Sequence, residues 1–263
     1  MTFEYKKEPI TMRAIDGSIV KIEHYNALTS TAEVAKRYAK DGVPDRFVIY
    51  ADRRVLNDDG DSEEGIFFSL LLRPSFFPSE AALLGAMSAT AMLTALEEHT
   101  DRSLGLGWIS DLYCDGVKIG STDIEGKLDS FAGYEYLIIS FSVRIDEKSF
   151  PKRLTDMIKR VFEPGNASIG MIMAKNIINT FLSYYQNMKS STKFMEIYTK
   201  KFILRGKTVK HIVDGKRRAR CVLGVDTKTG ALIVEKKVLF RQPEIIHITS
   251  PKSVIMPKKV SVR

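Results

Sequence analysis

The pattern of apolar and polar positions divides the chain into strand-like and helix-like segments. Residues 18–25 alternate apolar and polar side chains, which predicts a strand within a strand-rich region 1–28. The run 137–143 is apolar at almost every position and predicts a central strand. Shorter apolar runs predict further strands at 47–51, 66–72, 104–108, 112–114 and 117–119. Asp115-Gly116 lies between the last two runs and predicts a tight hairpin turn.

Four segments have the spacing of amphipathic helices. Thr29, Ser30 and Thr31 offer N-caps to a short helix that ends near Asp41-Gly42. Pro78-Ser79-Glu80 predicts the start of a helix with a wide apolar face. The other two helices are predicted at 149–162, capped by Ser149, and at 168–188. The segment 53–65 reads as a polar loop. We therefore expect an α+β fold, a mixed sheet with helices packed on one side.

The pattern changes after residue 196. Only short β-like runs follow, at 209–213, 221–225, 231–234 and 245–248, with turns at 214–215 and 228–230. This spacing predicts a small SH3-like β-barrel. The chain then divides into a domain over 1–197 and a C-terminal domain over 198–263.

Composition narrows the class of protein. The chain has 263 residues, of which 44% are hydrophobic and 27% are charged, as in globular proteins; this excludes disordered and fibrous classes. Its apolar stretches are too short or too interrupted for a transmembrane span, so no membrane partner is expected. The two cysteines, Cys114 and Cys221, are too few for a disulfide framework and fit a cytoplasmic location. The histidines and cysteines have no metal-ligand spacing, so no metal site is predicted.

Positive charge is concentrated in the C-terminal region. Residues 198–263 hold 17 Lys and Arg against 4 Asp and Glu, whereas residues 1–197 have a net charge of −5. Such asymmetry indicates either a solvated basic surface or a docking face for an acidic protein, a nucleic acid or an anionic membrane surface. The cluster 216–220 lacks interleaved aromatic residues, so a protein partner is favoured over nucleic acid.

Several motifs lie in a characteristic order along almost the whole chain. The stretch Trp108-Ile-Ser-Asp-Leu-Tyr-Cys-Asp-Gly-Val-Lys resembles the Lys-Trp-Pro-Asn-Asp motif of biotin protein ligases and its downstream lysine. Leu223-Gly-Val-Asp-Thr-Lys-Thr-Gly-Ala-Leu resembles a stretch of the C-terminal domain. Three further stretches resemble the family's helix start and the strands that flank its glycine/arginine-rich loop: Leu28-Thr-Ser-Thr-Ala, Phe47-Val-Ile-Tyr-Ala-Asp and Ile66-Phe-Phe-Ser-Leu.

The resemblance implies a two-step reaction. Biotin is activated by ATP, with Mg²⁺, to an acyl-adenylate, and the acyl group passes to a lysine of an acidic carrier domain of the biotin carboxyl carrier type. The resemblance assigns the catalytic role to Lys118, and a homodimer is a further expectation. The positions that it assigns to substrate binding are Ser30, Thr31, Arg53, Arg54, Trp108, Asp111 and Gly120.

The chain departs from the family where phosphate chemistry is expected. Between Asp52 and Phe68 there is no glycine/arginine-rich loop, and the acidic residues Asp58, Asp59, Asp61, Glu63 and Glu64 would repel a triphosphate there. Gly107, Ile109 and Ser110 replace the family's lysine, proline and asparagine. We therefore expect altered or weakened ligase activity, on biotin, lipoate or another acid. The alternative is a non-catalytic homologue that binds a partner through its basic C-terminal domain.

Overall fold

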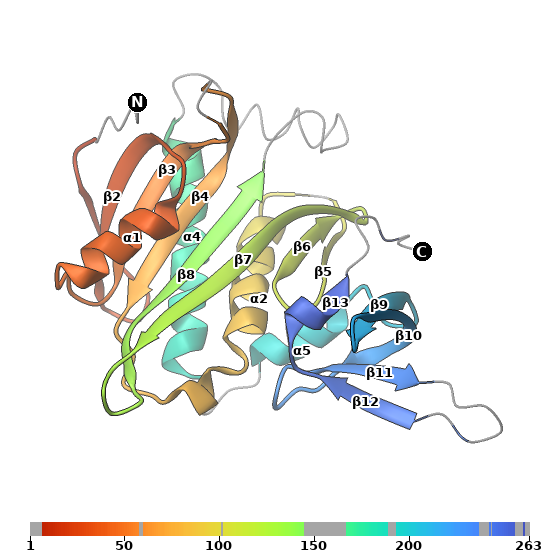
Figure 1. Ribbon diagram of the computed structural model, residues 1–263. Helices are drawn as coiled ribbons and strands as arrows, with labels where there is room; N and C mark the ends of the chain where they lie inside the picture. The colour runs from red at the N-terminus through yellow and green to blue at the C-terminus, as the bar shows by residue number, and fades with distance from the viewer. Residues whose placement is uncertain are drawn as a thin grey trace.

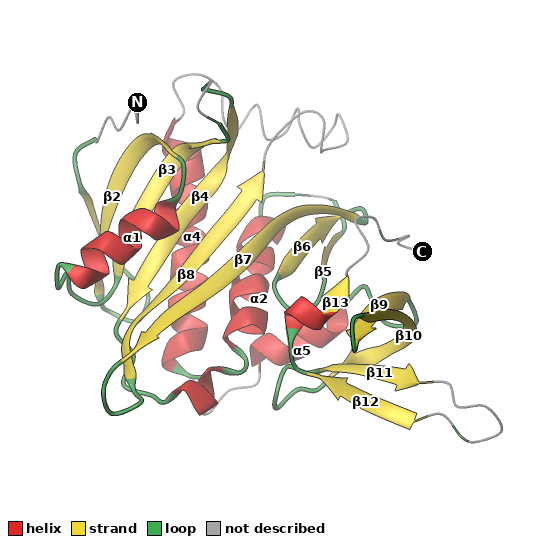
Figure 2. Ribbon diagram, in the orientation of Figure 1, coloured by secondary structure: helices red, strands yellow, loops and turns green. Residues whose placement is uncertain are grey.

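An eight-stranded sheet forms the centre of the molecule in the computed structural model (Figures 1 and 2), which describes residues 7–57, 60–100, 102–144, 167–188, 193–236, 242, 244–255 and 260. The strand order is β1-β2-β3-β4-β8-β7-β6-β5, in which only β2 and β3 pair in parallel. The strands are β1 (Ile10–Arg13), β2 (Ile19–Leu28), β3 (Phe47–Val55), β4 (Ser62–Leu72), β5 (Leu104–Leu106), β6 (Asp111–Cys114), β7 (Val117–Leu128) and β8 (Tyr134–Arg144). The mixed α+β class predicted from the sequence is confirmed.

Helices cover both faces of this sheet, so the expectation of helices on one side is wrong. Helix α1 (Thr31–Lys40) lies on the front face in Figure 1, and α2 (Leu84–Glu97) and α4 (Ala167–Gln186) lie behind it. The strands supply an apolar core to each side, because their side chains alternate between the faces. Ile49 and Ile138 pack under α1, whereas Phe68 and Phe141 stack behind the sheet, where Phe141 meets Phe181 of α4.

The predicted elements correspond closely to the observed ones, apart from strand ends, such as that of β7 at Leu128, and three further differences. The polar loop predicted at 53–65 is mostly strand, because β3 continues to Val55 and β4 begins at Ser62. Pro78–Ala81 is a 3-10 turn, and the α-helix begins only at Leu84. A helix that the sequence did not predict, α5 (Lys193–Lys201), spans the expected domain boundary. The helix predicted at 149–162 lies outside the described residues.

The segment Pro78–Glu97 is long and apolar enough to cross a membrane by length and composition, but 61% of it is buried inside the fold. That burial is typical of a core helix. Thr90 illustrates the packing, since its hydroxyl donates to the carbonyl of Ala86 within the helix. The helix packs against α4, α5 and the sheet.

A second, five-stranded antiparallel sheet follows α5, with the order β12-β11-β10-β9-β13. Its strands are β9 (Thr208–Val213), β10 (Lys216–Val225), β11 (Leu232–Lys236), β12 (Glu244–Ile248) and β13 (Val254–Ile255). Asp214 and Gly215 both have positive φ angles in the β9–β10 turn, which explains the Asp-Gly signal there. The SH3-like barrel and the division into domains 1–197 and 198–263 stay predictions.

Residues 104–108 connect the two sheets. Trp108 is 3% exposed, and its Nε1 donates to the carbonyl oxygen of Gly230 at 2.7 Å. Tyr198 of α5 donates to the carbonyl of Gly107 at 2.8 Å, and the amide of Ile203 donates to Leu106 at 3.0 Å. Since these groups are buried, each bond satisfies a polar atom that burial would otherwise leave unpaired.

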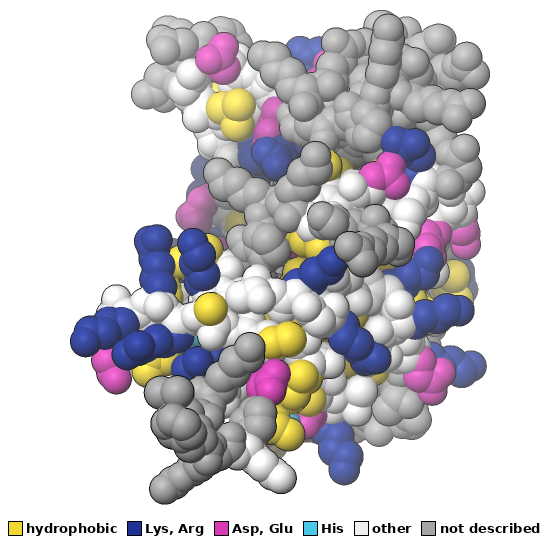
Figure 3. All heavy atoms as spheres, turned by 90° about the vertical axis from the view of Figure 1, so that its right-hand side faces the viewer, with side chains coloured by type: hydrophobic (Ala, Val, Ile, Leu, Met, Phe, Trp, Pro, Cys, Tyr) yellow, Lys and Arg dark blue, Asp and Glu magenta, His cyan; other side chains and the backbone are white. Residues whose placement is uncertain are grey.

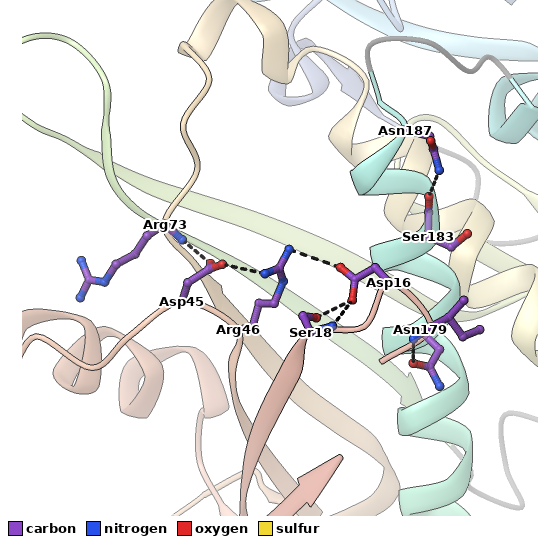
Figure 4. A network of polar contacts seen from close by, with 9 residues as sticks. Asp16, Ser18, Asp45, Arg46, Arg73, Asn179, Ser183 and Asn187 are labelled. Atoms are coloured by element: carbon purple, nitrogen blue, oxygen red, sulfur yellow. Dashed lines mark hydrogen bonds and ion pairs between the residues drawn. The ribbon is translucent and has the colours of Figure 1, made fainter. Parts of the chain in front are cut away.

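A polar network fixes the C-terminal end of α1. The guanidinium of Arg73 donates to the carbonyls of Ala39, Val43 and Glu135 at 2.8–3.0 Å, which satisfies the open end of the helix. The backbone amide of Arg73 donates to Asp45, and Arg46 connects Asp45 to Asp16 (Figure 4).

Candidate functional site

A cavity of about 330 Å³ lies at the N-terminal end of α1, on the front face of the large sheet. Helix α1 covers Ile138 of β8 and Leu71 of β4, but the same face is open further along these strands. There the side chains become smaller and more polar, and Ser140 and Ser142 follow Ile138 at every second position. The lining is completed by residues 28–33, Arg54, Phe67, Phe141, Ser121, Asp123 and Glu125.

Two hydroxyls of the cavity lining, those of Thr31 and Ser140, are connected through the buried hydroxyl of Ser69. Thr31 Oγ1 lies 2.7 Å from Ser69 Oγ, which lies 2.8 Å from Ser140 Oγ. Ser30 caps α1, because its hydroxyl accepts from the backbone amide of Glu33 at 3.2 Å. Hydroxyls both donate and accept, so they suit a small ligand with amide-like or carboxylate groups.

The structure therefore brings together three of the predicted substrate-binding residues, Ser30, Thr31 and Arg54. A bulge between Ala51 and Arg53 breaks the alternation of β3, and Arg54 lies on the cavity side. Its guanidinium lies 5.2 Å from the centre of the Phe67 ring, within the range of a cation–π contact.

Arg53 and Arg54 of β3 are both paired with carboxylates of the neighbouring strand β4. The register of β3 and β4 places Arg54 opposite Glu63 and Arg53 opposite Glu64. Arg54 forms an ion pair with Glu63, whose side chain is only 10% exposed. Arg53 pairs with Glu64 at 3.0 Å, and both side chains are exposed. The acidic run thus extends the strand pairing and neutralises these arginines.

The acidic residues of this segment that the structure describes do not gather into a metal site. Asp61 accepts from the side-chain amide of Asn57 at 2.9 Å in the connecting turn, and Asp58 and Asp59 lie outside the described residues. Within the described ranges, no group of three or more His, Cys, Asp or Glu side chains is placed to hold a metal ion.

Lys118 and Asp111 form an ion pair beside the cavity. Lys118 Nζ lies 2.6 Å from Asp111 Oδ1, with the side chains 38% and 13% exposed. Asp111 pairs directly with Ser121, a lining residue, and a bulge at Ile119 places Lys118 opposite Tyr113. Because a bulge shifts the alternation by one residue, Lys118 lies on the side of the sheet where Asp111 and Ser121 lie. Burial, with the charge of Asp111, raises the pKa of Tyr113 to about 12.

The other predicted residues lie away from the cavity lining. Trp108 is buried between the two sheets. Gly120 lies between β6 and β8, where an added Cβ would be 2.7 Å from the carbonyl oxygen of Ser142. That close strand approach gives a structural reason for glycine at this position.

Sequence reasoning missed the lining residues on β7 and β8, namely Ser121, Asp123, Glu125, Ser140 and Ser142. The available signal was the small polar residue at every second position of an otherwise apolar strand. In β8 these serines lie beyond the part of the face that α1 covers.

An ionic cluster lies where β2 and β3 run side by side. Asp52 accepts from Lys7 at 2.8 Å and lies 2.9 Å from Nε2 of His24. Burial raises the pKa of the Asp52 carboxyl, but the hydrogen bonds from His24 and Lys7 outweigh it and hold the pKa below its usual value. None of the three residues lines the cavity.

Comparison with known proteins identifies the fold. A mutant biotin protein ligase from Aquifex aeolicus, solved in complex with biotin, superimposes with a TM-score of 0.64 at 19% identity, over 89% of this chain and 97% of that one. A biotin acetyl coenzyme A carboxylase synthetase from Helicobacter pylori, with bound biotinylated ATP, gives 0.53 at 16% identity, over 86% and 98%. A biotin protein ligase-like protein of unknown function from Silicibacter gives 0.58 at 14% identity, over 88% and 94%.

Sequence comparison agrees over a shorter region. The bifunctional ligase/repressor BirA of Bacillus subtilis is 23% identical over 145 residues, which cover 51% of this chain and 44% of that protein, less than half of its length. No family model matches the chain. The chain thus has the biotin protein ligase fold, and the predicted resemblance is confirmed at the level of the fold.

We predict that the ion pair between Arg54 and Glu63 limits the binding of ATP. Glu63→Gln should raise the affinity for ATP by about five- to tenfold, because it frees a shielded guanidinium for the phosphates. Glu64→Gln is the matched control. Its exposed pair with Arg53 contributes little, so its effect should stay within about twofold.

Isothermal titration calorimetry with ATP on the three proteins measures this difference, and circular dichroism checks that the variants are folded. If the wild type and Glu63→Gln bind ATP with equal affinity, the ion pair between Arg54 and Glu63 does not limit ATP binding, and the prediction is wrong.

Proposed function

We propose that this protein binds a small carboxylic acid, biotin or a close relative, in the cavity at the N-terminus of α1 and activates it slowly with ATP for transfer to a lysine. The observation that carries the proposal is the hydroxyl-lined cavity with the Lys118–Asp111 pair beside it, within the biotin protein ligase fold. Similar structures have been solved with biotin and ATP, which supports these two substrates.

The chemistry assigns Lys118 a specific role. A carboxylate oxygen of the acid attacks the α-phosphorus of ATP, and the bond to pyrophosphate breaks. Negative charge increases on the α-phosphate during this step, and the ammonium of Lys118 would stabilise it. Asp111 positions that ammonium through their 2.6 Å contact. In the second step a lysine amine of the carrier attacks the acyl carbon, and AMP leaves.

The activation step is slow in this proposal because few cations face the phosphates. Arg54, which lines the cavity, is paired with Glu63, and Arg53 lies outside the cavity lining. Losing several charge-assisted contacts leaves an ATP dissociation constant of about 100 µM or weaker. Mg²⁺ would enter with the phosphates of ATP, since the described residues provide no three-ligand acidic site.

Lys118→Ala should lower the rate of adenylation at least ~100-fold, because the variant removes the cation that faces the developing phosphate charge. Lys127→Ala is the matched control. Lys127 lies on the same strand, pairs with Glu135 and does not line the cavity. The measurement is pyrophosphate release with biotin, lipoate or octanoate as the acid.

Calorimetry with each acid on the wild type reports binding apart from chemistry. Undetectable binding of all three acids would contradict the proposed function. Normal adenylation by Lys118→Ala would remove Lys118 from the mechanism.

The basic C-terminal sheet favours a second candidate function, binding of an acidic partner. The β9–β10 hairpin exposes Lys210, Lys216, Arg217 and Arg218, and Figure 3 shows more Lys and Arg than Asp and Glu side chains on this side of the molecule. An acidic carrier domain in the cytoplasm is the partner we favour, ahead of a nucleic acid or a second copy of this chain.

Binding of the acidic carrier domain should weaken steeply as salt rises, because screening shortens the range of charge interactions to about 8 Å at physiological ionic strength. Gel-shift titrations with oligonucleotides provide the comparison. Sub-micromolar DNA or RNA binding at physiological salt would show that a nucleic acid, and not an acidic carrier domain, is the preferred partner.

A further inference from the structure

The cavity is surrounded by more negative than positive charge. Its described lining contains three carboxylates, Glu33, Asp123 and Glu125, and one cation, Arg54. Arg54 is already paired with Glu63, so it contributes little net charge. Biotin is an anion whose head group is neutral, so its head group offers no positive charge to these carboxylates.

One lysine forms ion pairs with two of these carboxylates. Lys36 Nζ on α1 lies 2.7 Å from Glu33 and 2.5 Å from Glu125 on β7. The hydrogen bond from Lys36 lowers the pKa of Glu33, and the hydrogen bond to Glu125 raises the pKa of Lys36. Glu33 and Lys36 are therefore both charged at neutral pH. Counted at their formal charges, the ionisable lining residues and their ion-pair partners Lys36 and Glu63 comprise four carboxylates and two cations, a formal charge of −2.

Asp123 is the carboxylate that remains for a ligand. One of its oxygens accepts from the neighbouring amide of Ile124 at 3.0 Å, and no Lys or Arg of the described ranges forms an ion pair with it. It is directly opposite Ser140 on β8, and the next pair on the same face is Ser121 with Ser142. The carboxylate thus lies among hydroxyl oxygens that can accept further N–H groups.

We propose that the cavity selects a small carboxylic acid whose head group is a positively charged amidine or guanidine, and that Asp123 is the residue that determines this specificity. This inference rests on the proposed function, which places an acid in the same cavity. A planar guanidinium presents several N–H donors in one plane and matches a carboxylate flanked by hydroxyls. A neutral urea finds the same hydroxyls but gains less from the net charge, and an apolar head group gains nothing from either.

Biotin and 2-iminobiotin provide a matched pair of probes, because they share one carbon and sulfur framework and differ in a urea against a guanidine that is protonated at neutral pH. We expect 2-iminobiotin to bind about tenfold more tightly than biotin, from attraction to the net negative cluster. Asp123→Asn should reduce the ratio of the two affinities to about twofold or less, because it removes one unit of that charge.

Glu135→Gln is the control variant. Glu135 is a carboxylate of β8 that pairs with Lys127 and does not line the cavity, so the ratio should stay at its wild-type value. Calorimetry on the full chain at low and physiological salt measures all three proteins, and the preference should shrink as salt rises.

The outcomes separate this inference from the proposed function. If biotin binds as tightly as 2-iminobiotin or more tightly, the inference is wrong and the proposed function stands. If 2-iminobiotin binds and biotin does not, the inference stands and biotin is not the substrate. If neither compound binds, both are wrong. A full preference retained in Asp123→Asn would also overturn the inference.

Discussion

The candidate site follows from a mismatch in length between one helix and the strands beneath it. Helix α1 has ten residues and is about 15 Å long, whereas a strand of eleven residues such as β8 extends for about 36 Å. The helix therefore covers only part of the front face, and the apolar side chains under it are replaced by serines beyond its N-terminus. On the opposite face, α2 and α4 pack against the apolar side chains of the sheet. A ligand cavity is the consequence of this incomplete cover.

The charge of the cavity follows from how β3 meets β4. In place of a glycine/arginine-rich loop, the two strands continue into a hairpin, and cross-strand pairs join Arg54 to Glu63 and Arg53 to Glu64. Pairs of opposite charge stabilise a strand extension. The Arg54–Glu63 pair also occupies the cation of the cavity lining that a triphosphate would need. One sequence feature, the acidic run, therefore accounts both for a longer sheet and for the weak nucleotide binding we propose.

Much of the fold could be predicted from the sequence, because periodicity and turn residues report local structure directly. The Asp115-Gly116 hairpin, the helix that ends near Asp41 and the central strand 137–143 are all present. The sequence could not show which face of a strand is left uncovered, so Ser140 was not assigned to a site. It also could not show the bulge at Ile119 that turns Lys118 toward Asp111, since a bulge depends on the partner strand. Of the residues predicted from the resemblance, Ser30, Thr31 and Arg54 line the cavity, and Trp108 lies in the core.

The central claim is that the opening beside α1 is where a small acid binds. Hydrogen–deuterium exchange of the full chain, with and without saturating biotin or 2-iminobiotin, tests it most directly, because slowed exchange reports the amides that a ligand orders or covers. The account predicts slower exchange at residues 30–34, at the start of α1, and at 140–142 on β8, which line the cavity or border it. Slower exchange confined to the C-terminal sheet, with residues 30–34 unchanged, would contradict it.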